Sequence, residues 1–392
     1  MPSTSKTSSR RGFTLMEMMI SMAVGLLVLG VAVQIYSKGT DVTWIVTQRA
    51  EMQQDARAAE NLLAKDISLA NAGLSDSPQY LGVALATGGA NRPTFGGDYT
   101  GACHLGPANN ACYNYPVSGT SNYLFGVVPG WGKGPTISAA VGATDAITIV
   151  YLDTFFQLDD YQFQFVDING HDVIFTVPNG TVPAGSPNPT PNPLPQAISN
   201  SAVGLQRGDL VMFLNGTSAA IAEVTTAPGV GSAPPYDVGF ANASPLGFNQ
   251  DGATGGNIQQ SITKTAANVG TVLSTSTFKA FRVWVITYYI DKTRPTPTLM
   301  RLVNGRLPVP VAENVVDLRF TYDTYDANGN LLNNTGDGGL TSATPIMPSA
   351  IRTINLVHMT VRSQVHGSLG FQAIDMHTSI SARNLGFINR YN

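Results

Sequence analysis

Residues 18–37 carry no charged side chain, and this stretch restricts the fold of the chain more than any other feature. A transmembrane helix needs about 20 consecutive, mainly apolar residues to cross the hydrocarbon core of a bilayer. Lys6, Arg10 and Arg11 precede the stretch, and basic residues at one end of a span favour the cytoplasmic side for that end. The sequence therefore predicts a single-pass membrane protein whose remaining residues face outward.

Glu17 stands at the start of this uncharged stretch. Insertion scales put the cost of a charged side chain inside a transmembrane helix at about 2.5–3.5 kcal/mol, so such a residue usually has a function and a partner. A secretory signal peptide is one alternative, but it is cut after its apolar region near small residues, and no obvious site of that kind follows here. A plain signal anchor is another alternative, and it gives Glu17 no role.

Residues 10–17 (RRGFTLME) resemble the processing site of type IV prepilins. In that family a prepilin peptidase cuts after the glycine, on the cytoplasmic side of the inner membrane, and methylates the new N-terminal phenylalanine. The resemblance implies a leader at residues 1–12 that ends at Gly12, and a mature chain that begins with N-methylated Phe13. It also implies a protein that stays in the inner membrane, with its head in the periplasm, until it joins an extracellular pilus fibre.

The resemblance also gives Glu17 a role in assembly, as the fifth residue of the mature chain. In the family, this glutamate lies against the N-terminal amine of a neighbouring subunit. Opposite charges attract strongly at low dielectric, and either charge alone is unfavourable there, so the pair sets the register between subunits. Phe13 and Glu17 are also one helical turn apart, which makes pairing within one chain an alternative.

A stem helix is expected over residues 13–73, with residues 13–37 in the membrane. Apolar side chains recur every three or four positions in its second half, which predicts an amphipathic helix; they are Met52, Ala56, Ala59, Leu63, Ile67 and Ala70. Gly73 is expected to cap the helix after Ala72. Glycine weakens a helix, and the points where bending is expected are Gly25, Gly30 and Gly39. A membrane anchor followed by a separate soluble helix is the alternative.

The rest of the chain has the composition of a β-rich head. Only 12% of residues are charged, and the chain has 40 Gly and 24 Pro, which favours turns and short strands. Strands are expected at 146–151, 161–168, 171–177, 210–214, 281–290, 298–303, 315–322, 352–365 and 371–383. Asn169-Gly170 and Asn215-Gly216 indicate hairpins, and the Pro-rich residues 183–195 indicate a loop. The predicted fold class is α+β, with a long stem helix and a large β-rich head.

Parts of the chain resemble the PilW family of minor pilins. The similar segments are residues 63–67 (LAKDI), 311–323 (VAENVVDLRFTYD) and 381–384 (SARN). This resemblance divides the head into a Gly/Pro/Asn-rich region at 74–280, with no assigned family, and a C-terminal β-sheet region at 281–392. It also implies a part in starting pilus assembly.

Two loops of the head contain candidate crosslinking or binding residues. Cys103 and Cys112 are the two cysteines of the chain and lie in a Gly/Asn-rich loop, so a disulfide is expected in an oxidising periplasm. Residues 323–330 have the Asp, Asn and Gly content of a calcium loop, although the EF-hand pattern fails and an Asn-Gly turn is an equal explanation. The candidate calcium ligands are Asp323, Asp326, Asn328 and Asn330.

The patterns of common enzyme sites are missing from the sequence. It has no phosphate-binding loop, no nucleophile elbow and no zinc-binding spacing among its five histidines. The net charge of −3 and the lack of a basic cluster argue against nucleic acid as a partner. We therefore expect a protein that is not an enzyme and that needs no cofactor.

These features together predict a minor pilin of a type IV pilus, which helps to initiate the fibre and lies at or near its tip. The expected partners are other major and minor pilins, the prepilin peptidase and the inner-membrane pilus assembly machinery. A minor pseudopilin of a type II secretion system is one alternative, although its head is generally smaller. A pilus-tip adhesin that binds through the unassigned middle region is another. Twitching motility, cell adhesion and DNA uptake are all compatible fibre functions.

Overall fold

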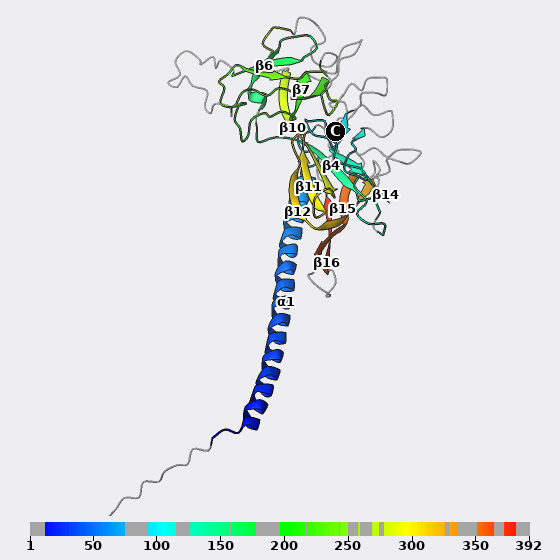
Figure 1. Cartoon of the computed structure of the whole chain (residues 1–392). Helices are drawn as coiled ribbons and strands as arrows, with labels where there is room; N and C mark the ends of the chain where they lie inside the picture. The colour runs from blue at the N-terminus through cyan, green and yellow to red at the C-terminus, as the bar shows by residue number, and fades with distance from the viewer. Residues whose placement is uncertain are drawn as a thin grey trace, which may run out of the picture. The chain divides into compact units, whose positions relative to one another are not determined.

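The computed structural model describes residues 12–74, 93–114, 126–140, 142–156, 158–177, 197–215, 218–242, 244–249, 258, 269–273, 278–325, 330–335, 351–363 and 372–381. The chain divides into two compact units, Met1–Gln53 with Ser363–Gln372 and Gln54–Arg362 with Ala373–Asn392. The first unit contains the N-terminal part of a long helix. The second contains the end of that helix and the β-sheets (Figure 1).

Helix α1 spans Leu15–Ser68 without interruption. It stays helical through Gly25, Gly30 and Gly39, the points where the sequence indicates bending or melting. It does not melt there, because a single glycine costs a helix only about 1 kcal/mol. Among the described residues, α1 is the one helix that is long and apolar enough to cross a membrane. The long apolar N-terminal helix of the predicted fold class is therefore confirmed.

One face of the second half of α1 is buried, as the apolar spacing predicts. The buried side chains are Met52, Ala56, Ala59, Leu63, Ile67 and Ala70. Glu51, Asp55 and Lys65, on the other faces, are not buried. Burial of an apolar stripe stabilises a helix in a protein more than its intrinsic propensity does, and this stripe begins the core of the second unit.

Helix α1 ends at Ser68 rather than at Ala72, the predicted end. The following amides donate to carbonyls three residues back, which is the tighter pattern common in the last turn of a helix. Asn71 then adopts a φ of 64°, and its amide donates to the carbonyl of Val150 at 2.8 Å. The helix stops early because the left-handed conformation of Asn71 turns the chain toward a strand.

Gly73 is the glycine that the exit from the helix requires. Its φ is 72°, a conformation that glycine adopts without steric cost. A Cβ added at Gly73 would lie 3.0 Å from the Cβ of Leu152, the last residue of β4 (Ala146–Leu152). Both the backbone and the close approach to β4 therefore favour glycine at this position.

The largest sheet has seven strands, in the order β12-β11-β10-β4-β3, with β7 attached to β10 and β8 attached to β7. Besides β4, its strands are β3 (Val127–Gly130), β7 (Leu210–Asn215), β8 (Ser218–Glu223), β10 (Phe278–Asp291), β11 (Thr298–Val303) and β12 (Val309–Glu313).

Strand β10 is the centre of this sheet. One of its edges pairs with β7 over residues 278–283 and with β11 over residues 286–291, and the other pairs with β4 over residues 283–288. The predicted boundary at residue 280 falls inside β10. On either side of it, β10 pairs with strands of the middle region, β4 and β7. The boundary therefore does not separate two sheets.

Three smaller antiparallel sheets complete the described part of the second unit. The first contains β5 (Gln162–Phe165), β6 (Asp172–Thr176) and β9 (Tyr236–Gly239). The second has the strand order β14 (Leu331–Thr335), β13 (Val315–Tyr325), β15 (Ile351–Ser363) and β16 (Gln372–Ser381). The third pairs β1 (Thr94–Phe95) with β2 (Tyr113–Asn114). A short 3₁₀ helix, η2, spans Leu158–Asp160. Every strand that the sequence predicts is present, while the predicted loop at 183–195 lies outside the described residues.

The two Asn-Gly sequences that indicate hairpins each occur between strands that pair antiparallel, as predicted. Asn169-Gly170 connects β5 to β6, with a φ of 76° at Gly170. Asn215 ends β7 and pairs with Ser218, the first residue of β8.

The β7–β8 hairpin has a hydrophobic cluster on each of its faces. Leu210 and Met212 belong to one cluster, and Val211 and Phe213 belong to the other. Alternate residues of a strand point to opposite faces, so a strand buried on both sides has a continuous apolar sequence. The second cluster is rich in aromatic rings, and the Phe213 ring lies 5.4 Å from the ring of Phe240.

Asp66 fixes the end of α1 to two strands of the large sheet. Its buried Oδ2 accepts hydrogen bonds from Tyr288 Oη on β10 (2.6 Å) and from Arg301 Nε on β11 (2.8 Å). Burial, with the Asp66 charge, raises the pKa of Tyr288 well above its ordinary value, so the hydroxyl remains a donor. A buried carboxylate is stable only when it is paired, and these two donors therefore determine where the helix end sits on the sheet.

Glu223, the last residue of β8, is a buried acid with incomplete hydrogen bonding. Its Oε2 accepts a hydrogen bond from the Leu246 amide (2.9 Å), while its Oε1 has no partner among the described residues. Burial raises the pKa of Glu223 to about 7, against hydrogen bonds from Leu246 and Ser244 that lower it. Folding therefore increases the protonated fraction of this residue.

We expect Asp66→Ala to lower the free energy of unfolding by about 3 kcal/mol, because it leaves the half-buried Arg301 charge without its partner. Tyr288→Phe removes one hydrogen bond and should cost about 1 kcal/mol. Denaturant unfolding of the full chain in detergent micelles, followed by tryptophan fluorescence, measures both. Asp55→Ala, an exposed change on the same helix, is the control and should stay within about 0.5 kcal/mol of wild type. An equal effect of Asp55→Ala and Asp66→Ala would contradict the anchoring role.

We expect Glu223 to make the folded protein less stable as the pH rises. The unfolded chain releases this proton near the ordinary glutamate pKa of 4.5, whereas burial raises the pKa in the folded chain to about 7. Its stabilising contribution is therefore complete below pH 4.5 and is lost as the pH rises through 7, a change of about 3 kcal/mol. Denaturant unfolding between pH 4.5 and 8 should show that Glu223→Gln removes this slope, while Glu313→Gln, at an exposed site, retains it. The same slope in Glu223→Gln and wild type would rule out the assignment.

Candidate functional site

The predicted cleavage site lies immediately before α1. Gly12 is exposed, and the Phe13 side chain is 81% exposed. A Cβ added to Gly12 would meet no atom within 4 Å, and the φ of Gly12 lies outside the left-handed region. The fold of the chain therefore does not require glycine at position 12, so a requirement for glycine would come from a molecule that recognises the segment.

Thr14 and Glu17 form a capping box at the start of α1. The Thr14 hydroxyl accepts a hydrogen bond from the Glu17 amide (3.3 Å), and Glu17 Oε2 accepts one from the Thr14 amide (3.0 Å). The Thr14 hydroxyl also donates to Glu17 Oε2 (3.1 Å). This reciprocal arrangement satisfies amides that have no partner inside the helix.

The charge pattern of the sequence indicates only Glu17 as a candidate. The structure identifies Thr14 as its partner. The signal was available in the spacing Thr-x-x-Glu immediately before an apolar run. The Glu17 carboxylate also lies at the positive end of the helix dipole, which favours a negative charge. In the uncut chain, Glu17 therefore has a partner within its own first turn.

The first part of α1 exposes its apolar side chains on all sides. The exposed large side chains that follow Phe13 are Leu15, Met16, Met18, Met19, Ile20, Met22, Val24, Leu26, Leu27, Val28, Leu29, Val31, Val33, Ile35 and Tyr36. A helix that is apolar all round needs lipid or other apolar helices around it. Glu17 is the one charged residue between Phe13 and Ser37, so it is the one charge that such surroundings must accommodate.

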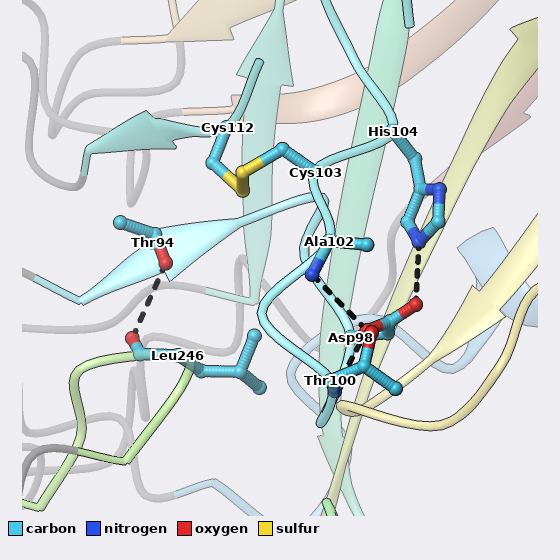
Figure 2. The surroundings of a disulfide bond; sticks show 8 residues. All are labelled: Thr94, Asp98, Thr100, Ala102, Cys103, His104, Cys112 and Leu246. Carbon is cyan, nitrogen blue, oxygen red and sulfur yellow. Dashed lines mark hydrogen bonds and ion pairs between the residues drawn. A yellow bond between two sulfur atoms is a disulfide. The ribbon is translucent and has the colours of Figure 1, made fainter. Parts of the chain in front are cut away.

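The structure joins Cys103 and Cys112, the predicted pair, in a disulfide (Figure 2). The bond closes the segment between β1 and β2, which pair with each other. Thr94 of β1 is attached to a distant segment, because its amide donates to the carbonyl of Leu246 (2.9 Å). The crosslinked loop is therefore part of the packed second unit.

Asp98 organises this disulfide loop from within (Figure 2). Its Oδ1 accepts hydrogen bonds from the amides of Thr100 (2.8 Å) and Ala102 (3.3 Å), and its Oδ2 lies 2.9 Å from His104 Nε2. Burial acts to raise the pKa of Asp98, but the hydrogen bonds from Thr100 and His104 outweigh it and hold the pKa below its ordinary value. Asp98 is therefore a charged internal cap of the loop.

The calcium candidates are only partly within the described residues. Asp326 and Asn328 lie outside them. Asp323 is in β13, where its Oδ1 accepts a hydrogen bond from Asn355 Nδ2 on β15 (3.2 Å), and Asn330 lies just before β14. At least one candidate ligand thus has a protein partner, and calcium binding stays a prediction.

Three described residues, two histidines and an aspartate, form a possible metal-binding group that the sequence analysis does not predict. His358 on β15 and Asp375 and His377 on β16 bring one potential ligand atom each within 4.8 Å of one another. The sequence signal was Asp375-Met376-His377, because residues two apart on a strand share a face. The third member, His358, lies on the neighbouring strand.

The N-terminal segment matches a known protein family. Residues 7–33 match the family described as a prokaryotic N-terminal methylation motif. The matched segment contains the predicted cleavage site, the capping box and most of the predicted membrane span, and it supports a type IV pilin-like or pseudopilin protein. No curated protein and no solved structure matches the chain.

We expect Thr14→Val to loosen the first turn of α1 while keeping the shape of the side chain. Loss of the hydroxyl cap should cost about 1 kcal/mol, which corresponds to about fivefold faster hydrogen exchange at the Glu17 amide. Glu17→Gln keeps an acceptor for the Thr14 amide, so exchange at Thr14 should change less than about twofold. Hydrogen exchange on the uncut full chain in micelles measures both amides. Unchanged exchange in Thr14→Val would show that the hydroxyl does not cap the helix.

Proposed function

We propose that this protein is a minor pilin of a type IV pilus, which joins the fibre through its N-terminal helix and helps to start its assembly. One observation carries the proposal: the junction Gly12–Phe13 is followed directly by a helix with exposed apolar side chains and a single charge, Glu17. The match to the N-terminal methylation motif covers the same residues. The proposed role is structural rather than catalytic and needs no cofactor.

The proposed processing step uses the exposure of the junction. A prepilin peptidase would cut the peptide bond between Gly12 and Phe13 and methylate the amine that cleavage creates. The accessible, unconstrained Gly12 supports this step, because no packing in the described part of the chain blocks the approach of an enzyme. The new amine would lie one helical turn from Glu17, at the edge of the bilayer.

The proposed assembly step exchanges the partners of Glu17. In the uncut chain, its carboxylate is held by Thr14 of the same chain. In a bundle of subunit helices, the amine of a neighbouring Phe13 is a stronger partner, because opposite charges attract more strongly than a charge and an amide at low dielectric. A subunit docked in the wrong register would leave both charges unpaired, so the pair selects the correct position.

The size of the head supports a place at or near the fibre tip. The described residues after the stem helix fold around two hydrophobic clusters and form four sheets. Protein interiors are close-packed and do not interpenetrate, so a large head would collide with the next layer of a tightly stacked shaft. No layer lies above the tip. The resemblance to the PilW family, with its implied role in initiation, favours the same position.

A minor pseudopilin of a type II secretion system is the second candidate, because the same N-terminal features support it. The large head favours the pilin. The two functions make different predictions for deletion of the gene: loss of surface fibres for a minor pilin, and loss of a secreted protein with intact fibres for a pseudopilin.

We expect Gly12→Val to block cleavage and leave uncut precursor in the membrane, because the peptidase requires glycine before the cut. The substitution should not disturb the fold, since a Cβ at Gly12 meets no atom within 4 Å. Glu17→Gln should be cut normally but enter fibres at least about tenfold less, the effect of losing about 1.4 kcal/mol of docking free energy. Mass spectrometry of the N-terminus and of sheared fibres, in cells that carry each variant, measures both. Gly39→Ala is the matched glycine control, because a Cβ at Gly39 also meets no atom within 4 Å.

Three results would contradict this proposal. Fibre-associated protein that retains Met1 or Pro2 would exclude processing, and normal incorporation of Glu17→Gln would exclude the charge pair. An abundance in sheared fibres equal to that of the main shaft subunit would exclude the tip position.

A further inference from the structure

The side chains of His358, Asp375 and His377 form a cluster on the outer face of the β15–β16 pair. His358 Nδ1 lies 2.7 Å from Asp375 Oδ2, and His377 Nε2 lies 3.3 Å from the same oxygen. The two imidazole ring centroids are 5.2 Å apart. We propose that these three side chains bind a divalent transition metal, with Zn²⁺ as the ion that the donor set fits best.

The spacing of the donor atoms fits this ion. Zn²⁺ binds histidine nitrogen and carboxylate oxygen at about 2.0–2.2 Å, so two ligand atoms of a tetrahedral site lie about 3.3 Å apart. The 3.3 Å separation of His377 Nε2 from Asp375 Oδ2 agrees with that value, whereas the 2.7 Å separation of His358 Nδ1 from the same oxygen is a hydrogen-bond distance that a bound ion would lengthen. Two imidazoles and one carboxylate with an open fourth position are a known zinc ligand set, and the partly exposed side chains leave room for water there.

The contacts around the cluster orient each ligand. The Val357 carbonyl accepts a hydrogen bond from His377 Nδ1, and because a carbonyl can only accept, Nδ1 carries the proton. In the neutral ring Nε2 is therefore the bare nitrogen, and it faces Asp375 Oδ2. The Thr360 hydroxyl donates to Asp375 Oδ1 (3.1 Å), which leaves Oδ2 for the ion. Outer contacts of this kind orient metal ligands and raise their affinity.

The position of His358 depends on an irregularity in β15. His358 pairs with Arg319 of β13, and Leu356 pairs with the next residue, Phe320, so Val357 is an extra residue in the ladder. The buried positions change from 354 and 356 to 359 and 361 across this point. The bulge therefore turns His358 to the solvent face, where Asp375 and His377 lie, and such re-aiming of a side chain is a common use of bulges.

The neighbouring charge does not oppose a bound cation. Arg319 is the cross-strand partner of His358, but its Nε contacts Asp317 Oδ1 (2.9 Å) and its Nη1 lies 3.8 Å from Asp145 Oδ1. The guanidinium is therefore balanced by two carboxylates of its own. Without a metal, the cluster would consist of exposed His–Asp pairs, which contribute little to stability.

Bound metal would hold β16 to β15. Strand β16 is an edge strand and the last described element of the chain. One ligand comes from β15 and two come from β16, so the ion would cross-link the two strands. Hydrogen exchange of the β16 amides should therefore slow when Zn²⁺ is added.

Isothermal titration of the metal-free full chain in micelles with ZnCl₂ tests the proposal. We expect one site per chain, an affinity at least about 100-fold lower in His377→Ala, and about tenfold lower in Thr360→Val, which changes only the orientation of Asp375. Asp375→Asn keeps the shape of the side chain and should also weaken Zn²⁺ binding strongly. It tests the site independently if His377→Ala fails to fold. Co²⁺ in place of Zn²⁺ should give the visible absorption of a tetrahedral nitrogen and oxygen site.

His171→Ala is the matched control, because His171 is also a partly exposed histidine beside an aspartate, Asp167, at 4.0 Å. It should bind Zn²⁺ as wild type does. The proposal is overturned if wild type binds no Zn²⁺ at micromolar concentration, or if His377→Ala and Asp375→Asn bind it as tightly as His171→Ala.

Discussion

The buried carboxylate of Asp66 is the interaction on which the second unit depends. It joins the last turn of α1 to β10 through Tyr288 and to β11 through Arg301. Because β10 also pairs with β4 and β7, one strand connects the helix end to the sheet beside both hydrophobic clusters. Apolar contacts alone are non-directional, whereas a buried carboxylate accepts only where its donors lie. Asp66 therefore specifies the position of the helix end as well as stabilising it.

The elements of the fold follow from local patterns, but their partners do not. The spacing of Ala56, Ala59 and Leu63 predicts the buried stripe of α1, and β11 has the predicted bounds. Asp66, by contrast, has the local sequence of an ordinary helix surface, and its donors are 222 and 235 residues away in the chain. For the same reason, the sequence division at residue 280 misses the central role of β10, which is a property of pairing and not of composition.

The candidate functional residues differ in the same way. Glu17 is predictable as a candidate because a charge at the edge of a membrane span costs free energy and so usually has a function. The partnership of Thr14 with Glu17 is predictable from the capping-box spacing Thr-x-x-Glu. His358 was not readable, because regular alternation from Leu356 places residue 358 on the buried face. The bulge at Val357 reverses that alternation. The single extra residue, Val357, therefore puts His358 on the exposed face, where the candidate metal site lies, although the strand pattern predicts the buried face.

The junction at Asp66 has a mechanical consequence. A helix extends under tension by breaking its hydrogen bonds one after another, so each bond in turn carries the full load. At Asp66 the load is instead shared by Tyr288, Arg301 and the buried apolar stripe, which must yield together. A chain that is pulled by its helix while its sheets are held would therefore resist more at the end of α1 than a helical turn with no such contacts would.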